Sequence, residues 1–160
     1  MSNTTQARPE RLIDARGPRY TAAITTLVLS AALVTESNLI IGFQFAVFLS
    51  AVLFGLRRSV YGYIYRKLIQ PRLSGPVPSE NEAAPRFAQL VGALFAATAL
   101  LGGLTGNTTV FQIATSFALG AAFLNSIFGI CLGCKLHLTI IRLKSILGLR
   151  ESPIFEPRSV

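Results

Sequence analysis

The residues with the clearest chemistry are Cys131 and Cys134, the only two cysteines of the chain. Positions three apart lie on one face of a helix, so the thiols can approach each other and a disulfide is sterically feasible. If a new helix begins near Cys131, after a break between Gly129 and Gly133, its N-terminus favours the thiolate that disulfide exchange requires. If the preceding helix continues instead, this advantage is lost. The spacing is compatible with both arrangements and predicts a candidate pair of redox thiols.

Other roles for this pair compete with thiol exchange. A zinc site needs about four ligands, and Cys131, Cys134 and His137 supply three at most, so a metal would need a second chain or a partner protein. Attachment of a c-type haem requires histidine at the position of Lys135. A permanent structural disulfide is disfavoured in a reducing cytoplasm. The remaining alternative is two unpaired cysteines in the membrane. We therefore predict no cofactor and no metal held by this chain alone.

The elements that position the cysteines are predicted from hydropathy. The chain is 51% hydrophobic and only 14% charged, and its mean hydropathy is +0.54. A helix needs about 20 apolar residues, within a tolerated range of roughly 17–25, to cross the ~30 Å hydrocarbon core of a bilayer. Four stretches meet this requirement and predict an all-α membrane protein with four transmembrane helices. These stretches cover residues of about 20–36, 39–57, 87–104 and 110–132.

The basic residues predict the orientation of these helices. All fifteen lysines and arginines lie before the first span, between the second and third, or after the fourth. Because positive charge is retained on the cytoplasmic side, both termini and the central loop are predicted to be cytoplasmic. Anionic lipid headgroups suit this charge as a partner, at about 1 kcal/mol for each basic residue near the surface. The net charge of +8 therefore does not indicate a nucleic-acid partner.

The sequence also contains a weak internal repeat at an offset of sixty-seven residues. Pro18–Tyr20 corresponds to Pro85–Phe87, and Ser59–Gly62 corresponds to Ser126–Gly129. Two matched ends at one offset predict two tandem helical hairpins. Since each hairpin crosses twice, both have the same orientation and form parallel repeats.

The thiol pair belongs to the second half alone. At the same offset, Cys131 and Cys134 correspond to Ile64 and Lys67. Because the first hairpin is predicted to fold without cysteines, the fold does not require them, and some other demand accounts for the pair.

Each hairpin is predicted to end in a short amphipathic helix on the inner membrane surface. The hairpins cover residues 20–70 and 87–150, and these helices lie at about 58–70 and 135–149. The cytoplasmic N-terminal segment, the linker and the C-terminal tail cover residues 1–19, 71–86 and 151–160.

Polar residues inside the spans predict helix contacts rather than transport. Gln44, Gln112 and Asn125 are suited to hydrogen bonds between helices. The cores of the spans contain no charged residue, which argues against a carrier or a pore. Small residues four positions apart, such as Ala118 and Ala122, predict close helix packing within one chain or in a homo-oligomer.

Three segments resemble a known family. They read "IDARGPRYTAA", "APRFAQLVG" and "AAFLNSIFGICLGCKLHL", and they are similar to the DUF4395 family of small actinobacterial multi-pass membrane proteins, whose function is unknown. The resemblance extends from about Ile13 to Leu143. One departure is Lys135, where family members often have glutamate. The resemblance implies a multi-pass protein of the bacterial plasma membrane, expected beside thioredoxin-like or sulfurtransferase proteins, and it names no reaction.

Two functions remain open at this point. In the first, Cys131 and Cys134 exchange disulfides or relay sulfur with a cytoplasmic thioredoxin-like or rhodanese-like partner, so the protein is at most a component of an exchange system. In the second, the protein is a non-catalytic accessory subunit of a larger membrane complex. The cysteines would then be packing residues or local metal ligands.

Overall fold

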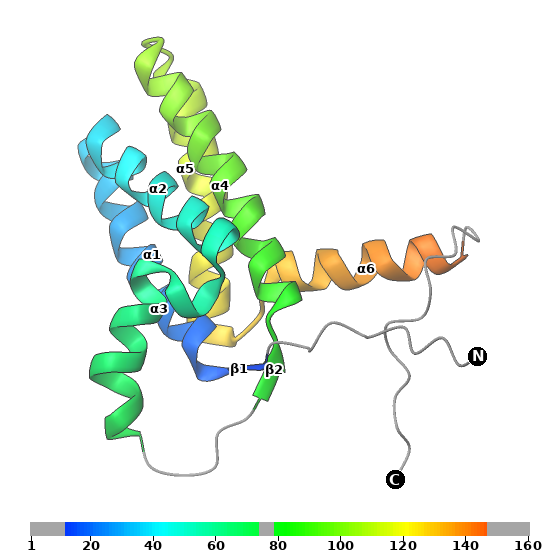
Figure 1. Cartoon of the computed structure of the whole chain (residues 1–160). Coiled ribbons are helices and arrows are strands. Elements are labelled where there is room, and N and C mark those ends of the chain that lie inside the picture. The colour runs from blue at the N-terminus through cyan, green and yellow to red at the C-terminus, as the bar shows by residue number, and fades with distance from the viewer. Residues whose placement is uncertain (1–11, 74–78, 147–160) are drawn as a thin grey trace, which may run out of the picture.

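The computed structural model describes residues 12–73 and 79–146, and within these ranges the chain is all-α apart from one pair of three-residue strands. Four helices form a bundle, and a fifth long helix, α6, projects from its side (Figure 1). The bundle helices are α1 (Arg16–Thr35), α2 (Asn38–Phe54), α4 (Ala83–Leu104) and α5 (Thr108–Phe128), and α6 covers Leu132–Ile146. The all-α prediction is confirmed. Most of the predicted N-terminal segment, part of the linker, the end of the last amphipathic helix and the tail lie outside the described residues.

Short helical turns connect the two halves of the bundle. After α2 the chain forms η1 (Leu56–Arg58), α3 (Val60–Ile64), a π-helical turn η2 (Tyr65–Ile69) and η3 (Gln70–Arg72). The stretch predicted as an interfacial helix at about 58–70 is therefore helical throughout most of its length, in several short pieces rather than one.

Two helices of the described chain are long and apolar enough to cross a membrane. They are α4, with 22 residues, and α5, with 21 residues. Only 22% of the apolar window is buried in each, whereas a core helix of a soluble protein would be mostly buried. α2 is apolar but has 17 residues because Gly55, with φ +86°, ends it. α1 has 20 residues, but two arginines and four threonines lower its hydropathy.

In the bundle, each helix of the first half packs mainly against a helix of the second half. α1 packs most extensively against α5, and α2 packs most extensively against α4. Small side chains allow this close approach, as is common between membrane helices. Larger side chains fill the remaining space at the centre. The core consists of Leu29, Ala32, Ile41, Phe48, Ala93, Ala96, Ala99, Phe111, Ala114 and Ala118.

A small antiparallel sheet lies at the end of the bundle where α1 and α4 begin, in segments where the sequence predicted only a terminal segment and a linker. β1 (Leu12–Asp14) pairs with β2 (Ser79–Asn81), and Ile13 lies opposite Glu80. The Asp14 carboxylate accepts a hydrogen bond of 2.9 Å from the Arg16 amide, and the Asn81 side chain accepts one of 2.9 Å from the Ala83 amide. The two strands are sixty-seven positions apart, and so are these two contacts.

Two arginines that were predicted only to orient the spans also hold helix ends. Arg19 at the start of α1 donates to the Ile127 carbonyl in the last turn of α5, at 3.5 Å. Arg86 at the start of α4 donates through Nε to the Val52 carbonyl in the last turn of α2, at 2.7 Å. The last carbonyls of a helix lack intrahelical partners and favour cations. Each arginine therefore joins the start of one helix to the end of its main neighbour from the other half.

The two halves differ where α2 and α5 end. Ser59 begins α3 and accepts a hydrogen bond of 3.1 Å from the Gly62 amide. The corresponding Ser126 lies inside α5, because Ala122 stands where Gly55 ends the helix in the first half. The match of these two segments in sequence is therefore not a match in local structure.

Glu82 links the two halves from a buried position. The residue is 5% exposed, and its Oε1 accepts a hydrogen bond of 2.6 Å from the backbone amide of Leu56, just after α2 ends. We expect Glu82→Ala to lower the free energy of unfolding by about 1–3 kcal/mol, because a buried donor loses its acceptor. Glu82→Gln retains an acceptor oxygen and should lose less than half as much. Denaturant unfolding in a mild detergent measures both, and equal losses would contradict the role of this hydrogen bond.

Tyr65 anchors the sheet and provides a prediction on pH. Its hydroxyl donates to Oδ2 of Asp14 at 2.7 Å, and burial, followed by this hydrogen bond, raises the pKa of Tyr65 to about 12 from an ordinary 10.0. The unfolded chain therefore loses this proton first, so the stabilisation is complete below pH 10 and is lost as pH rises toward 12. Ultraviolet titration should show one fewer late-ionising tyrosine in Tyr65→Phe than in the wild type. An unchanged titration would contradict the assignment.

Candidate functional site

The helix is interrupted between α5 and α6. The fourth apolar segment is therefore not continuous through Gly129–Gly133, which the sequence had left open. α5 ends at Phe128, and Gly129 adopts a left-handed conformation with φ +66°. The Gly129 amide donates to the Asn125 carbonyl at 3.1 Å, and the Ile130 amide donates to the Leu124 carbonyl at 3.4 Å. Glycine is favoured at this C-terminal position because it has no Cβ. The fourth apolar helix is thus shorter than predicted, and α6 begins at Leu132 rather than near 135.

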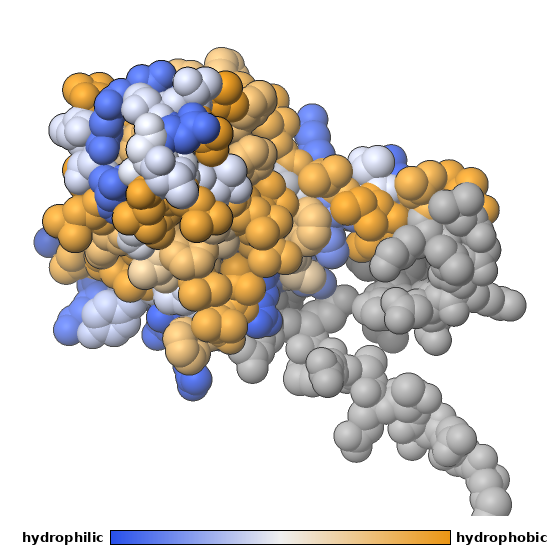
Figure 2. Space-filling view, turned by 90° about the horizontal axis from the view of Figure 1, so that it is seen from above, coloured by the Kyte–Doolittle hydropathy of each residue, from blue (hydrophilic) through white to orange (hydrophobic). Residues whose placement is uncertain are grey.

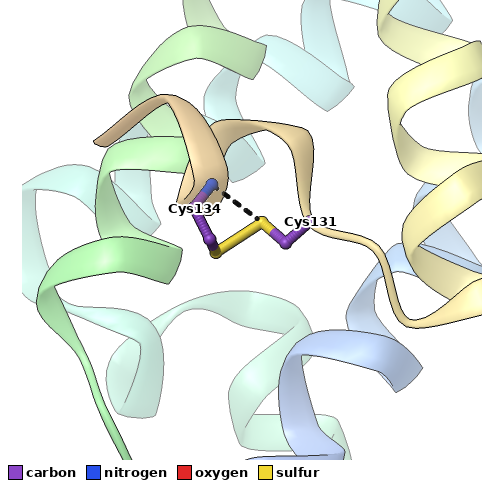
Figure 3. Close-up of a disulfide and its surroundings, with 2 residues drawn as sticks. All are labelled: Cys131 and Cys134. Atoms are coloured by element: carbon purple, nitrogen blue, oxygen red, sulfur yellow. Dashed lines mark hydrogen bonds between the residues drawn. A yellow bond between two sulfur atoms is a disulfide. The ribbon is translucent and has the colours of Figure 1, made fainter. Parts of the chain in front are cut away.

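The two cysteines lie together at the start of α6 (Figure 3). They form a disulfide with a Cα–Cα distance of 5.1 Å. The backbone amide of Cys134 donates to Sγ of Cys131 at 3.2 Å, and the Lys135 amide donates to the Cys131 carbonyl at 3.0 Å. Cys131 thus has the position of an N-cap residue, with sulfur as the acceptor that a serine or aspartate oxygen usually provides. Both cysteines are half-buried.

Contacts with α4 fix the first turns of α6. A Cβ added at Gly133 would lie 2.6 Å from both Cα and Cβ of Ala88, so only glycine allows the two backbones to approach this closely. One turn later, the His137 ring packs against Phe87 with 5.1 Å between ring centroids. Gly133, between the cysteines, therefore allows the start of α6, which carries the disulfide, to pack closely against α4.

A cavity of about 260 Å³ adjoins the disulfide. Residues of α1, α2, α4, α5 and α6 line it, and most of them are alanine, phenylalanine or leucine. Cys131 is part of the lining and Cys134 is not. The polar lining residues are Thr25, Gln89 and Asn125. The Thr25 side chain is 3% exposed, and its hydroxyl has no hydrogen-bond partner within the described ranges.

The predicted site residues divide into two groups in the structure. Cys131 and Cys134 come together, whereas the His137 ring lies against Phe87. Among residues 12–73 and 79–146, no group of three or more histidine, cysteine, aspartate or glutamate side chains could hold a metal ion.

The three polar residues that were predicted to lie inside the spans have separate surroundings. The buried Gln44 accepts a hydrogen bond of 2.9 Å from the Tyr61 hydroxyl. Gln112 donates to the Glu36 carboxylate at 2.7 Å, next to the turn between α1 and α2. Asn125 lines the cavity, together with Thr25. Nothing in the sequence distinguished Thr25 from the other threonines of its helix, because only the packing of five helices creates the cavity.

Comparison with protein families confirms the resemblance that was stated from three sequence segments, one of which contains both cysteines. The family described as a domain of unknown function, DUF4395, matches residues 13–142. The chain belongs to the DUF4395 family. The matched DUF4395 region includes both cysteines, all four bundle helices and every residue that lines the cavity. Comparisons with curated proteins and with solved structures give no match. The evidence for a function of this DUF4395 domain therefore lies in its own residues.

Proposed function

We propose that this DUF4395 protein spans the bacterial plasma membrane four times and exchanges disulfides through Cys131 and Cys134 on the cytoplasmic side. Support for four spans comes from the surface of the bundle. Figure 2 shows hydrophobic side chains over much of that surface. All four helices contribute large apolar side chains that are more than half exposed, which a soluble surface of this extent would rarely show. They include Leu27, Val34, Leu39, Phe43, Leu53, Leu94, Leu101, Ile113 and Phe117.

The lengths of the first two helices suit this proposal. α2, with 17 residues, extends about 26 Å at 1.5 Å per residue and reaches the lower limit of a membrane span. α1, with 20 residues, is long enough. The fifteen basic residues lie at one end of the four helices in sequence, which supports a cytoplasmic location for both termini and for the disulfide. α6 exposes Leu136, Leu138 and Ile141 and is suited to the inner membrane surface.

The observation that carries the exchange function is the hydrogen bond from the Cys134 amide to Sγ of Cys131. A thiolate at Cys131 would keep this hydrogen bond and would lie at the positive end of α6. Such stabilisation makes Cys131 a good leaving group in thiol–disulfide exchange. Because both sulfurs are already bonded to each other, electron transfer fits the pair better than a sulfur relay, which needs only one thiolate.

The exchange takes two steps. A thiolate of a thioredoxin-like dithiol attacks Sγ of Cys134, the bond between Cys131 and Cys134 breaks, and Cys131 leaves as a thiolate. The second partner thiolate then attacks the partner's own sulfur in the mixed disulfide and releases Cys134. The partner becomes a disulfide, and the pair gains two electrons and, on protonation, two protons.

Differential alkylation tests this proposal on the full chain in lipid nanodiscs. The protein is equilibrated with a thioredoxin at a series of reduced-to-oxidised ratios, quenched with acid and labelled with a heavy maleimide. We expect both cysteines to gain labels together, with the concentration dependence of a two-electron couple. Cysteines that stay unlabelled at every ratio would overturn the exchange function and leave the accessory-subunit role, which co-purification with a membrane complex would support.

A further inference from the structure

The cavity beside Cys131 has the features of a binding site for an uncharged ligand. Its volume of about 260 Å³ exceeds the ~150 Å³ of an apolar cavity that accepts benzene. No described lining residue is charged, so a phosphate-bearing nucleotide or flavin would find no counter-charge. Thr25 lines the cavity, and its buried hydroxyl has no partner among the described residues, so a turn of this side chain would let it donate a hydrogen bond to a ligand. A buried polar group without a partner is costly, and a ligand carbonyl would satisfy it.

The cavity also reaches the surface of the molecule. Two of its lining residues, Phe117 and Leu136, are 65% and 47% exposed. Phe117 lies on α5, a candidate membrane helix, and Leu136 lies on α6. In the proposed orientation, this part of the wall faces the acyl chains, so a ligand with a hydrocarbon tail can enter from the bilayer.

We propose that this cavity binds a membrane quinone, which accepts the electrons that the cysteine pair receives. This inference rests on the proposed exchange function and deepens it by naming the oxidant. The reduced pair loses two electrons and two protons: both S–H bonds break and one S–S bond forms between Cys131 and Cys134. The quinone gains the same two electrons and two protons, and its two carbonyls become the hydroxyls of a quinol.

The different positions of the two sulfurs agree with electron transfer from the partner to the quinone through this pair. Cys131 lines the cavity, and Cys134 lies outside the lining. A soluble partner that attacks Cys134 releases the Cys131 thiolate next to the quinone. Thr25 and Asn125 provide donors for a quinone carbonyl from α1 and α5.

The test uses the reduced full-length protein in nanodiscs, freed of reductant and mixed anaerobically with a fully ring-substituted benzoquinone that carries a ten-carbon chain. Full substitution prevents addition of thiols to the ring. Ultraviolet absorbance measures quinol, and maleimide labelling measures thiol loss. We expect one quinol for each pair of thiols lost.

Two variants test the place of binding. Thr25→Val removes the hydroxyl at nearly constant shape and should raise the quinone concentration for half-maximal rate about fivefold, the effect of one hydrogen bond. Ala121→Phe fills the cavity and should lower the rate at least ~10-fold. The matched control is Thr26→Val, because the Thr26 hydroxyl donates to the Ala22 carbonyl within α1 at 2.8 Å and Thr26 does not line the cavity.

The outcomes separate this inference from the exchange function. If thioredoxin reduces the pair but the quinone does not oxidise it, the quinone site is overturned and the exchange function stands. If Thr25→Val, Thr26→Val and the wild type behave alike, the quinone does not bind in this cavity. If quinol forms but thioredoxin never reduces the pair, the exchange function fails and the quinone site is supported.

Discussion

Replacing Gly62 with alanine is expected to lower the free energy of unfolding by about 3 kcal/mol, the upper end of the usual cost of overpacking. A Cβ at this position would lie 1.9 Å from the carbonyl oxygen of Leu56 and 3.0 Å from the hydroxyl oxygen of Ser59. The first of these atoms belongs to the backbone, so no change of side-chain rotamer relieves the overlap. The turn from η1 into α3 must therefore open.

The turn around Gly62 also controls contacts further along the chain. Tyr61 reaches Gln44 in α2, and Tyr65 reaches Asp14 in β1. If the turn opens, both hydrogen bonds are strained or lost, and the packing of α3 and η2 against α2 and β1 loosens. Denaturant unfolding in a mild detergent, together with size-exclusion chromatography, measures the loss.

Gly120→Ala is the matched control for Gly62→Ala. A Cβ at Gly120 would meet no atom within 4 Å, and this glycine lies inside α5. Alanine is a better helix former than glycine by about 1 kcal/mol, so the control variant should equal or exceed the wild type in stability. Similar losses in the two variants would show that the overlap at Gly62 is not the cause.

Hydropathy predicted the bundle helices because a run of apolar residues needs no tertiary information to be recognised. The ends were harder to predict. Gly55 ends α2 at Phe54. Ala122 stands at the corresponding place in the second half, and there α5 continues to Phe128. The sequence shows glycine at both Gly62 and Gly129, yet only Gly129 has a positive φ. A glycine can mark a helix end or a close contact, and only the neighbouring backbone decides which.

The thiol pair was predictable, and its surroundings were not. Spacing alone brought Cys131 and Cys134 to one face of a helix. The cavity depends on how five helices pack, and the two strands have only three residues each, too few for an alternating pattern to be recognised. From the sequence, Glu82 is predicted only as part of the linker. Arg86 is predicted only as a charge that orients the helices. Their hydrogen bonds to Leu56 and Val52 appear only once the two halves are placed together.

Replacing Cys131 with serine is expected to lower the rate of electron transfer from a thioredoxin-like dithiol through this protein by at least ~100-fold, because one remaining sulfur cannot form the internal disulfide. Serine is itself a favoured N-cap residue, and its oxygen can accept the hydrogen bond from the Cys134 amide. The start of α6 should therefore persist in Cys131→Ser, with thermal stability close to that of the wild type. A large loss of activity without a loss of stability separates a redox role from a packing role. Activity within twofold of the wild type would contradict the proposed function.

The companion variant Cys134→Ser distinguishes the two sulfurs from each other. It should lose as much turnover, because it also leaves a single sulfur, but the remaining cysteine lies beside the cavity. When the remaining thiol of each variant is first converted to a mixed disulfide with thionitrobenzoate, a single-cysteine thioredoxin should form its covalent complex at least ~10-fold faster with Cys134 than with Cys131. Release of thionitrobenzoate gives both rates. The ranking follows from geometry: a protein thiol must approach from the aqueous side, and Cys131 lines a cavity that opens among the bundle helices. A reversed ranking would assign the partner to Cys131, and the order of the two exchange steps would then be inverted.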